Sequence, residues 1–447
     1  MHPSGRSRLQ LRTEITGKTS RWNCLETSFS GSFTISRKFV KFIKYAGFLW
    51  DAWLTVIGEG YQKPLCLYKP KLETLQTFNF INFTNFMNFI NFTNFFLFLF
   101  GISLSGASQK TASADSITLF FVGDVMQHSP QINGAWNPTS GEHDYKPCFQ
   151  YIRPYWEKAD YVIANLETTL DNKNFSGYPQ FCAPWQLARD LKACGVDLLT
   201  TNNNHSCDKG HEGIRKTIYY LDSLQIPHTG TFTDTASWQK QTPLYIRHGN
   251  FKIALLSYTY GTNGIPVTHG QVVSMIDSSV MTRQIRQARL DSATNVIIMI
   301  HWGIEYATAQ NAEQKAIAAL LHKSGADIVI GSHPHVVQPL EYTVTGTDTT
   351  GVTVYSLGNF VSNQSKRYTN GGIGIQLQLT RQAGKTHYDM HYLSSYVHRP
   401  IENGIRRYYV IPEPKAARLL GQQDSTLYTE FFHDTDSIIN GKCAKLR

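Results

Sequence analysis

The sequence predicts an α/β fold from about residue 116 onward, and three observations support this prediction. Short apolar runs alternate with amphipathic helical segments along this part of the chain. Runs such as those at residues 117–122, 295–300 and 327–330 are almost entirely apolar, as expected of parallel strands that are covered on both faces. The chain has 447 residues, of which 41% are apolar, so it can bury a large core. Strands that alternate with helices are typical of α/β proteins.

Each expected element is identified by its local pattern of residues. Runs rich in β-branched and aromatic residues predict strands at residues 117–122, 161–165, 196–200, 252–258, 295–300, 327–330, 352–356 and 372–379. Helical periodicity predicts helices at residues 185–194, 212–224, 279–290 and 312–323. The periodicity weakens after about residue 399. We therefore expect a domain over residues 116–400 and a C-terminal covering segment over residues 401–447.

The net charge of +9 is concentrated in the first part of the chain. Residues 1–107 contain 12 Lys and Arg against 5 Asp and Glu, whereas the remainder contains 30 against 28. The expected globular part is therefore nearly neutral, which disfavours nucleic acid as a partner. The seven cysteines are odd in number and form no CxxC pair, which argues against a zinc ribbon and leaves one or two disulfide bonds open.

The segment before the expected domain is typical of an export signal. Residues 78–100 form a Phe/Asn repeat, the chain is purely apolar around residues 95–104, and the run ends in Ser105-Gly106-Ala107. An apolar run followed by small residues is the pattern of a secretory signal peptide. We therefore expect an exported protein of the periplasm or cell envelope, with a mature N-terminus near Ser108, that contacts the membrane only through this segment.

Two interpretations of the start of the chain are open. In the first, residues 1–86 are an upstream extension and the product begins at Met87, with residues 87–107 as its signal peptide. In the second, the long leader is real and residues 95–106 are a short anchor. Neither interpretation predicts a fold for residues 1–86.

Polar side chains follow six of the expected strands, at the point where each strand ends. They are Asp124, Glu167, Asn204 with His205 and Asp208, His301 with Glu305, His333 with His335, and Asn359. In an α/β sheet, ligands bind beyond the carboxyl ends of the strands, so these side chains are expected to converge. Carboxylate, amide and imidazole groups together suit divalent ions such as Mn²⁺, Fe²⁺ or Zn²⁺, in contrast to a thiolate site.

Taken singly, most of these residues have a structural alternative. Asp124 could cap a helix, Glu167 could be a solvated loop residue, and His301 could be a buried core histidine. His333 and His335 are more specific, because alternate residues of an extended segment point to the same side and can share a metal ion. Six such strand ends in order favour a common site.

The motifs at these positions resemble those of the CapA family of capsule and poly-γ-glutamate synthesis proteins, a branch of the calcineurin-like metallophosphoesterase superfamily. They are Gly123-Asp124-x-Met126, Asn165-Leu166-Glu167, Asn203-Asn204-His205-x-x-Asp208-x-Gly210, His301-Trp302-Gly303-x-Glu305-Tyr306, His333-Pro334-His335-Val336-x-Gln338-Pro339 and Ser356-Leu357-Gly358-Asn359-Phe360. The resemblance spans residues 117–361 and implies a four-layer α/β/β/α sandwich with the site at one edge of its two sheets.

The resemblance also implies a role for each residue of the site. The ligands of one or two metal ions would be Asp124, Glu167, Asn204, His301, His333 and His335. His205 would protonate the leaving group. Apart from the resemblance, Asp208 is close enough to His205 in the sequence to orient its ring, and Glu305 would help to handle protons if the protein is an enzyme. The sequence departs from the superfamily at Met126, which stands where a histidine is usual, and a thioether is a poor ligand for a hard dication.

Two functions are open at this point. In the first, the protein is a metal-dependent hydrolase that cleaves a phosphoester or an amide bond of a polymer. In the second, it is a non-catalytic envelope component that binds an anionic polymer and assists its assembly or export, alongside other capsule-synthesis proteins. Trp302, Tyr306 and Asn359 are candidates for substrate contact, although aromatic residues beside a strand end also occur in cores.

Overall fold

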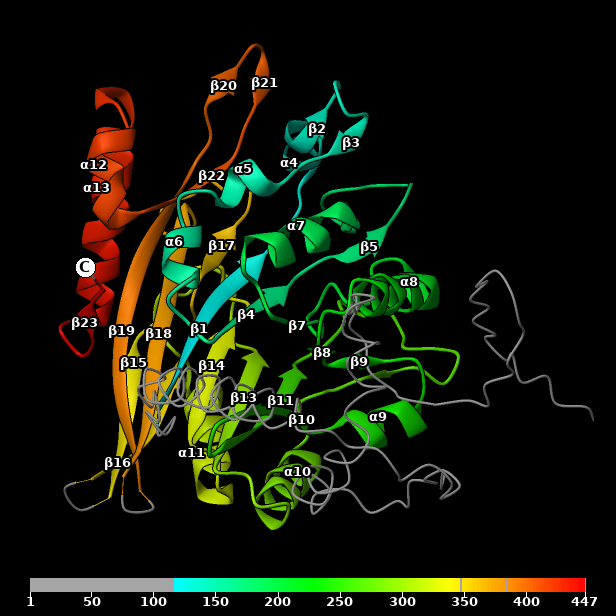
Figure 1. Cartoon of the computed structure of the whole chain (residues 1–447), viewed down its shortest axis with the longest axis vertical. Coiled ribbons are helices and arrows are strands. Elements are labelled where there is room, and N and C mark those ends of the chain that lie inside the picture. Colours follow the sequence, from blue (N-terminus) through cyan, green and yellow to red (C-terminus); the bar gives the residue numbers. More distant parts are fainter. Residues whose placement is uncertain (1–115, 346–347, 383–384, 447) are drawn as a thin grey trace, which may run out of the picture. The chain divides into compact units, whose positions relative to one another are not determined.

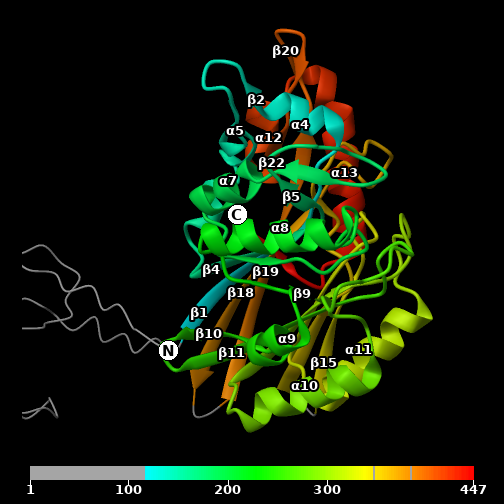
Figure 2. The same ribbon diagram turned by 90° about the vertical axis from the view of Figure 1, so that its right-hand side faces the viewer.

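The computed structural model describes residues 116–345, 348–382 and 385–446. The expected upstream extension and signal peptide, residues 1–107, lie outside the described residues. Two large sheets dominate the described part, and both lie between groups of helices (Figures 1 and 2). This arrangement confirms the α/β prediction.

The larger sheet has nine strands and joins the start of the domain to its end. Along its main path the order is β22-β19-β18-β1-β4-β7-β8, with β17 beside β1 and β23 beside β19. The strands are β1 (Ser116–Val125), β4 (Tyr161–Leu166), β7 (Leu198–Thr200), β8 (His228–Thr229), β17 (Asn359–Val361), β18 (Gly371–Gln382), β19 (Lys385–His398), β22 (Tyr409–Pro412) and β23 (Ala444–Lys445). Strands β1, β4, β7 and β8 run parallel, whereas β18 is antiparallel to β1 and β19 is antiparallel to β18.

The smaller sheet has six strands in the order β10-β11-β13-β14-β16-β15. The strands are β10 (Leu244–His248), β11 (Phe251–Thr259), β13 (Asn295–His301), β14 (Ile328–Ser332), β15 (Leu340–Thr345) and β16 (Asp348–Val354). The four central strands are parallel, and an antiparallel strand closes each edge. The carboxyl ends of β11, β13 and β14 therefore meet at one edge of this sheet.

Alternating side chains divide the core into layers. On β1, Ile117, Leu119 and Phe121 pack in a cluster shared with the smaller sheet, whereas Phe120 and Val122 face a cluster of helices on the other side. Those helices are α5 (Lys146–Phe149), α6 (Arg153–Trp156), α7 (Gln186–Cys194) and α8 (Gly210–Ser223). Helices α10 (Ser278–Leu290) and α11 (Ala312–Ser324) cover the outer face of the smaller sheet. The two sheets thus pack against each other, and helices cover the outer face of each.

The remaining elements are short, apart from the 18-residue helix α13. They are α4 (Ser129–Ala135), β2 (Trp136–Asn137), β3 (Glu142–His143), β5 (Thr169–Asp171), β6 (Cys182–Pro184), β9 (Thr231–Phe232), α9 (Thr235–Gln241), β12 (Val272–Val273), β20 (Ile401–Glu402), β21 (Ile405–Arg406), α12 (Glu413–Leu419) and α13 (Gln422–Ile439). No helix of the described part is both long and apolar enough to span a membrane. The five cysteines within the described ranges are buried and form no disulfide bond.

Helix boundaries agree with local capping chemistry. Before α11, the Asn311 side chain accepts from the Gln314 N–H at 2.8 Å, and the Gln314 side chain accepts from the Asn311 N–H at 3.0 Å. The helix ends at Gly325, whose φ of 111° lies in the left-handed region that glycine tolerates. The expected strands and helices are present, with ends shifted by a few residues.

The C-terminal segment is joined to the larger sheet. Its strands β22 and β23 both pair with β19, and helices α12 and α13 pack against the same strand. Strand β19 was not among the expected strands, because its first half, which includes His387, Asp389 and His391, is largely polar.

Candidate metal centre

The segment at the end of β1 aims Asp124 into the interior. A β-carbon at Gly123 would lie 2.0 Å from the carbonyl oxygen of Gly358, so only glycine allows β17 to approach this closely. The Asp124 N–H donates to that same carbonyl at 3.1 Å, and Asp124 is opposite Asn359 in the parallel register. Asp124 is fully buried as a result.

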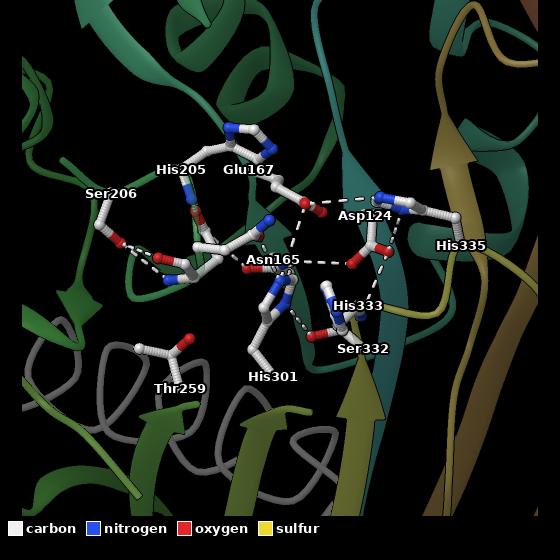
Figure 3. Close-up of polar contacts among 12 residues, drawn as sticks. Asp124, Asn165, Glu167, His205, Ser206, Thr259, His301, Ser332, His333 and His335 are labelled. Atoms are coloured by element: carbon white, nitrogen blue, oxygen red, sulfur yellow. Dashed lines mark hydrogen bonds and ion pairs between the residues drawn. The ribbon is translucent and has the colours of Figure 1, made fainter. Parts of the chain in front are cut away.

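The site lies where strand ends of both sheets converge (Figure 3). Asp124 and Glu167 come from β1 and the end of β4 in the larger sheet, whereas His301 ends β13 in the smaller sheet. Potential ligand atoms of these three residues lie within 4.8 Å of one another. The Oε1 atom of Glu167 is 3.7 Å from Nε2 of His301 and 3.8 Å from Nε2 of His335. His335 also reaches Asp124, with 3.1 Å between Nδ1 and Oδ2.

Glu167 is the residue that defines this cluster as a ligand site. It is fully buried, and neither of its carboxylate oxygens has a hydrogen-bond partner among the described residues. Burial, followed by the nearby Asp124 carboxylate, raises the pKa of Glu167 well above its ordinary value. An uncompensated buried carboxylate is costly, and a cation between these groups would remove that cost. The donor set therefore fits a divalent metal ion.

Two histidines of the cluster, His301 and His333, favour the neutral form. Burial, followed by the neighbouring imidazoles, lowers the pKa of His301 well below its ordinary value and that of His333 to about 3. A neutral imidazole offers a lone pair to a metal ion. His301 Nδ1 lies 2.9 Å from the Ser332 hydroxyl, and its Nε2 lies 2.8 Å from Oδ1 of Asn204. A metal-binding histidine normally has such a partner on its second nitrogen.

His333 and His335 reach the cluster by a different backbone path from the expected one. We predicted an extended segment, but β14 ends at Ser332 and the φ angles of His333 and His335 are 99° and 60°. Such angles are strained in residues with side chains and persist where the surrounding structure imposes them. The ring centroids of His333 and His301 are 4.8 Å apart. Nδ1 of His333 lacks a hydrogen-bond partner within the described ranges, which leaves it available to a ligand.

His205 is fixed beside the cluster by Asp208. Its Nδ1 lies 2.7 Å from Oδ2 of Asp208, and the Phe181 N–H donates to the same oxygen at 2.5 Å. The edge of the Phe181 ring packs on the imidazole, with 4.6 Å between ring centroids. Because Nδ1 is engaged by the carboxylate, Nε2 is the nitrogen left to exchange a proton with a bound molecule.

Comparison with known proteins identifies the family. The family model for the bacterial capsule synthesis protein PGA_cap matches residues 118–364. The chain belongs to the PGA_cap family. It is 28% identical over 289 residues to the capsule biosynthesis protein CapA of Bacillus anthracis, which covers 61% of this chain and 66% of that protein. It is also 28% identical over 299 residues to the PGA biosynthesis protein CapA of Bacillus subtilis strain 168, covering 64% and 75%.

These relatives confirm the resemblance found in the motifs. The chain spans slightly less than two thirds of the length of the Bacillus anthracis protein that it matches. Among solved structures, the NAD nucleotidase of Haemophilus influenzae aligns with a TM-score of 0.39 and 11% identity, covering 72% of this chain and 68% of that one.

One of the three expected substrate contacts in this PGA_cap protein, Trp302, is a core residue instead. Trp302 is 1% exposed, packs in the core under α10 and α11, and donates from its ring nitrogen to the Tyr355 carbonyl at 2.9 Å. Asn359 is fully buried opposite Asp124, and its side-chain N–H donates to the Thr369 carbonyl at 3.1 Å, whereas its amide oxygen has no hydrogen-bond partner among the described residues, so its role stays a prediction. Trp302 directly follows His301 and packs on the helix side, away from the cluster.

Tyr306 and Glu305, in contrast, lie at the mouth of the site. The ring of Tyr306 is 42% exposed, and its centroid is 6.2 Å from that of His335. The Lys366 ammonium lies 4.9 Å from the same ring. Glu305 is exposed, and its charge contributes to the raised pKa values of Glu167 and Tyr260.

The sequence analysis missed the amides that orient Asp124. Asn165 donates to Oδ1 of Asp124 at 2.9 Å and accepts from the Asn203 side chain at 3.2 Å. Asn203 accepts in turn from the His205 N–H at 3.1 Å, so these amides link the metal cluster to the expected proton donor. Asn165 and Asn203 are both part of the motifs quoted in the sequence analysis, and those motifs were the sequence signal that could have identified them.

His128 was also missed. Burial, followed by the charges of His335 and His205, lowers the pKa of His128 to about 4. Its ring stacks edge-on against Phe181, with 5.0 Å between centroids. It follows Asp124 by four residues, so the loop that carries the unusual Met126 also brings an imidazole near the site.

Proposed function

We propose that this PGA_cap protein acts in the synthesis of a bacterial capsule or poly-γ-glutamate-type polymer as an exported, metal-dependent hydrolase. The family and the names of the two Bacillus relatives support the capsule role. The observation that carries the hydrolase role is the buried Glu167 carboxylate, which has no hydrogen-bond partner in the described part and faces His301 and His335. A protein that served only as a scaffold would gain nothing from a buried carboxylate that destabilises its fold.

One or two ions of Mn, Fe or Zn would be held by Asp124, Glu167, Asn204, His301, His333 and His335. Such an ion would polarise the scissile group and make water a better nucleophile at neutral pH. Asn165 keeps the Asp124 carboxylate in position, and Ser332 does the same for the His301 ring. The near-complete burial of these ligands excludes bulk water and strengthens every charge interaction within the site.

His205 would deliver the proton that the leaving group needs. Asp208 holds its Nδ1, so the proton would leave from Nε2. At the mouth, Lys366 supplies a positive charge beside Tyr306, which favours an anionic polymer or a phosphoester as substrate. Glu305 at the same mouth would accept or return protons as substrate and product exchange.

The alternative is a non-catalytic component that binds the anionic polymer and works with other envelope proteins of capsule synthesis. Lys366 and Tyr306 at the mouth would serve that role equally well. The two functions differ in what they require of Glu167 and His205, because polymer binding at the mouth needs neither side chain.

The test combines metal content with a hydrolysis screen. Purified protein is expected to bind about one or two divalent ions and to cleave a phosphodiester or poly-γ-glutamate, with no cleavage in the His335→Ala variant. Metal binding without cleavage of any substrate in the screen would favour the binding role. Absence of both would overturn the hydrolase proposal.

Export is tested separately. N-terminal sequencing of the native protein is expected to begin near Ser108, after the small residues that suit a signal peptidase. A mature protein that retains residues before Met87 would contradict the signal-peptide interpretation.

A further inference from the structure

The chain that follows β11 brings residues to the metal centre that the sequence analysis did not identify. Strand β11 runs parallel to β13, and its last residue, Thr259, is opposite His301 (Figure 3). Both strands therefore end at the edge of the smaller sheet where the cluster lies. The Tyr260 N–H donates to the His301 carbonyl at 3.0 Å, so the pairing continues for one residue past β11. We call residues 260–264 the Tyr260 loop.

The Tyr260 ring packs on two of the candidate metal ligands. Its centroid is 4.5 Å from that of His333 and 6.3 Å from that of His301, and the planes of the Tyr260 and His301 rings differ by only 9°. His301 and His333 are 2% and 3% exposed, whereas Tyr260 is 47% exposed. Tyr260 thus contacts the buried histidines and also reaches solvent. A molecule that approaches these histidines from solvent would meet this side chain.

The hydroxyl of Tyr260 is a hydrogen-bond donor near the cluster. Burial, followed by the charges of Glu305 and Glu167, raises the pKa of Tyr260 to about 12, and the Asn204 side chain acts on the same hydroxyl in the opposite direction. A tyrosine hydroxyl that keeps its proton at neutral pH can donate it in a hydrogen bond. Tyr260 is exposed, in contrast to the buried Glu167, so this donor is open to an incoming ligand.

The charges around Tyr260 restrict which molecules it can contact. Glu305 and Glu167 are the two carboxylates that act on its hydroxyl, and the ammonium of Lys366 lies farther along the mouth, 4.9 Å from the Tyr306 ring. The two carboxylates would repel an anionic oxygen unless a divalent ion held by the cluster offset their charge. The hydroxyl therefore suits a molecule that binds together with the ion.

The same loop orients a candidate metal ligand. The Asn204 side chain donates from Nδ2 to Oδ1 of Asn263 at 3.3 Å, and its Oδ1 lies 2.8 Å from Nε2 of His301. Asn263 has a φ of 51°, in the left-handed region that asparagine tolerates. The amide oxygen of Asn204 therefore faces the cluster, and the Tyr260 loop serves both a ligand and the open side of the site.

We propose that Tyr260 contacts the molecule bound at the metal centre and that its hydroxyl donates a hydrogen bond to an oxygen of that molecule. The proposal rests on the metal-dependent site proposed above and adds to it a group that is not a metal ligand. A phosphoester and an amide both offer such an oxygen, which is negatively charged in the first and gains negative charge when the second is attacked. A donor fixed beside that oxygen stabilises the charge in the transition state.

The test compares full-length wild type with Tyr260→Phe in the binding of inorganic phosphate, a tetrahedral anion that has the oxygens of a phosphoester. Both proteins are loaded with Mn²⁺, or with Zn²⁺ if Mn²⁺ does not bind, and phosphate affinity is measured by isothermal titration calorimetry. Tyr260→Phe should bind phosphate roughly 10–100-fold more weakly, because one hydrogen bond to a charged group is lost. Its metal affinity should equal that of wild type, because the ring on the histidines is retained.

Two further variants separate the loss of the hydroxyl from a disturbance of the loop. Tyr219→Phe removes the hydroxyl of another exposed tyrosine, on α8, and should bind phosphate and metal like wild type. Asn263→Ala removes the partner of Asn204 and should weaken metal affinity by roughly tenfold, with phosphate affinity retained once the protein is fully loaded. The two changes within the Tyr260 loop thus have opposite signatures.

The outcomes distinguish this proposal from the hydrolase proposal. The contact by Tyr260 is overturned if Tyr260→Phe binds phosphate like wild type, if that variant loses its metal, or if metal-loaded wild type binds no phosphate. In these three cases the hydrolase proposal still stands or falls by its own cleavage screen. Failure of wild type to bind Mn²⁺, Fe²⁺ or Zn²⁺ would overturn both proposals.

Discussion

The two ends of strand β14 lie beside similar residues, but these residues have hydrogen-bond partners at one end, whereas at the other end some of them lack such partners among the described residues. Asp327 immediately precedes the strand and lies near His322 and Arg289. At the other end the strand finishes at Ser332, next to the metal cluster. Both ends therefore hold carboxylate and imidazole groups, which are half-buried at the start of the strand and buried at its end.

At the start of β14 every charged group has a partner. Arg289 donates to Asp327 at 2.6 Å, and the Val296 N–H donates to the same carboxylate at 2.6 Å. His322 bonds the Ala326 carbonyl through Nδ1 and the Thr353 hydroxyl through Nε2, at 2.9 and 2.7 Å. We call Arg289, His322 and Asp327 the satisfied cluster. Its polar groups need no ligand.

At the end of β14 the corresponding groups are left open. Glu167 and Nδ1 of His333 have no partner in the part of the chain that the structure describes, although both residues are almost fully buried. The difference teaches that a carboxylate beside a histidine does not by itself indicate a metal site. In the candidate site the same kinds of groups are buried and lack partners, which leaves them available to a ligand.

The largest expected difference between the two clusters is in metal binding. His335→Ala should abolish binding of the divalent ion, or weaken it by more than about 100-fold, because it removes a ligand and not only a supporting group. The matched change His322→Ala in the satisfied cluster should leave metal content at the wild-type value. Elemental analysis and metal titration of both proteins measure this. Equal metal content in the two variants would show that the imidazoles of the two clusters have the same, structural role.

The next effect is on turnover without loss of metal. His205→Asn should retain the ion and reduce hydrolysis by roughly 10²–10⁴-fold, the usual contribution of a general acid. The loss should be smallest for substrates with good leaving groups, which need no proton. Loss of the metal in this variant would instead make His205 a ligand. Retention of metal with full biological activity would favour the binding role over hydrolysis.

A smaller effect is expected from the hydroxyl behind each histidine. Ser332→Ala removes the partner of His301 Nδ1 and should weaken metal affinity by about 10–100-fold. Thr353→Val removes the partner of His322 Nε2 in the same way and should not change metal affinity. Competition with a chelator of known affinity measures both values. If the two variants lose affinity equally, the effect is transmitted through general destabilisation.

The smallest effect concerns the stability of the metal-free protein. The pKa of Glu167 is raised on folding, so the folded state holds this proton more tightly than the unfolded state. The metal-free protein should therefore lose stability as the pH rises from the ordinary value of 4.5 toward the folded pKa. Glu167→Gln stays neutral and should be more stable than wild type at pH 7 by about 1–3 kcal/mol.

Thermal unfolding of both proteins after metal removal, at several pH values, checks this prediction. Asp327→Asn is the control, because Arg289 already compensates that carboxylate and its loss should destabilise the fold instead. A Glu167→Gln variant that is less stable than wild type throughout would mean that the carboxylate has a stabilising partner.

Much of the candidate site was predictable because it follows strand ends. Asp124 and His301 terminate runs of apolar residues that are readable as buried parallel strands, and such ends share one edge of a sheet. The prediction of substrate contact failed for Trp302, because the direction of its side chain had to be inferred. Trp302 follows His301 directly, but whether its side chain faces the site or the helices depends on how the chain leaves β13.

The amino-acid sequence by itself was enough to predict the α/β class, the family and the candidate residues of the metal centre, because periodicity and motifs are local properties of the sequence. The tertiary structure alone decided which groups have their hydrogen bonds satisfied. The sequence does not show that His322 and Asp327 have partners in the fold whereas Glu167 has none among the described residues. At one end of β14, Arg289 and Thr353 from distant segments hydrogen-bond to Asp327 and His322. At the other end, no group in the described part hydrogen-bonds to the Glu167 carboxylate. A partner supplied across the fold leaves no trace in the local pattern of residues.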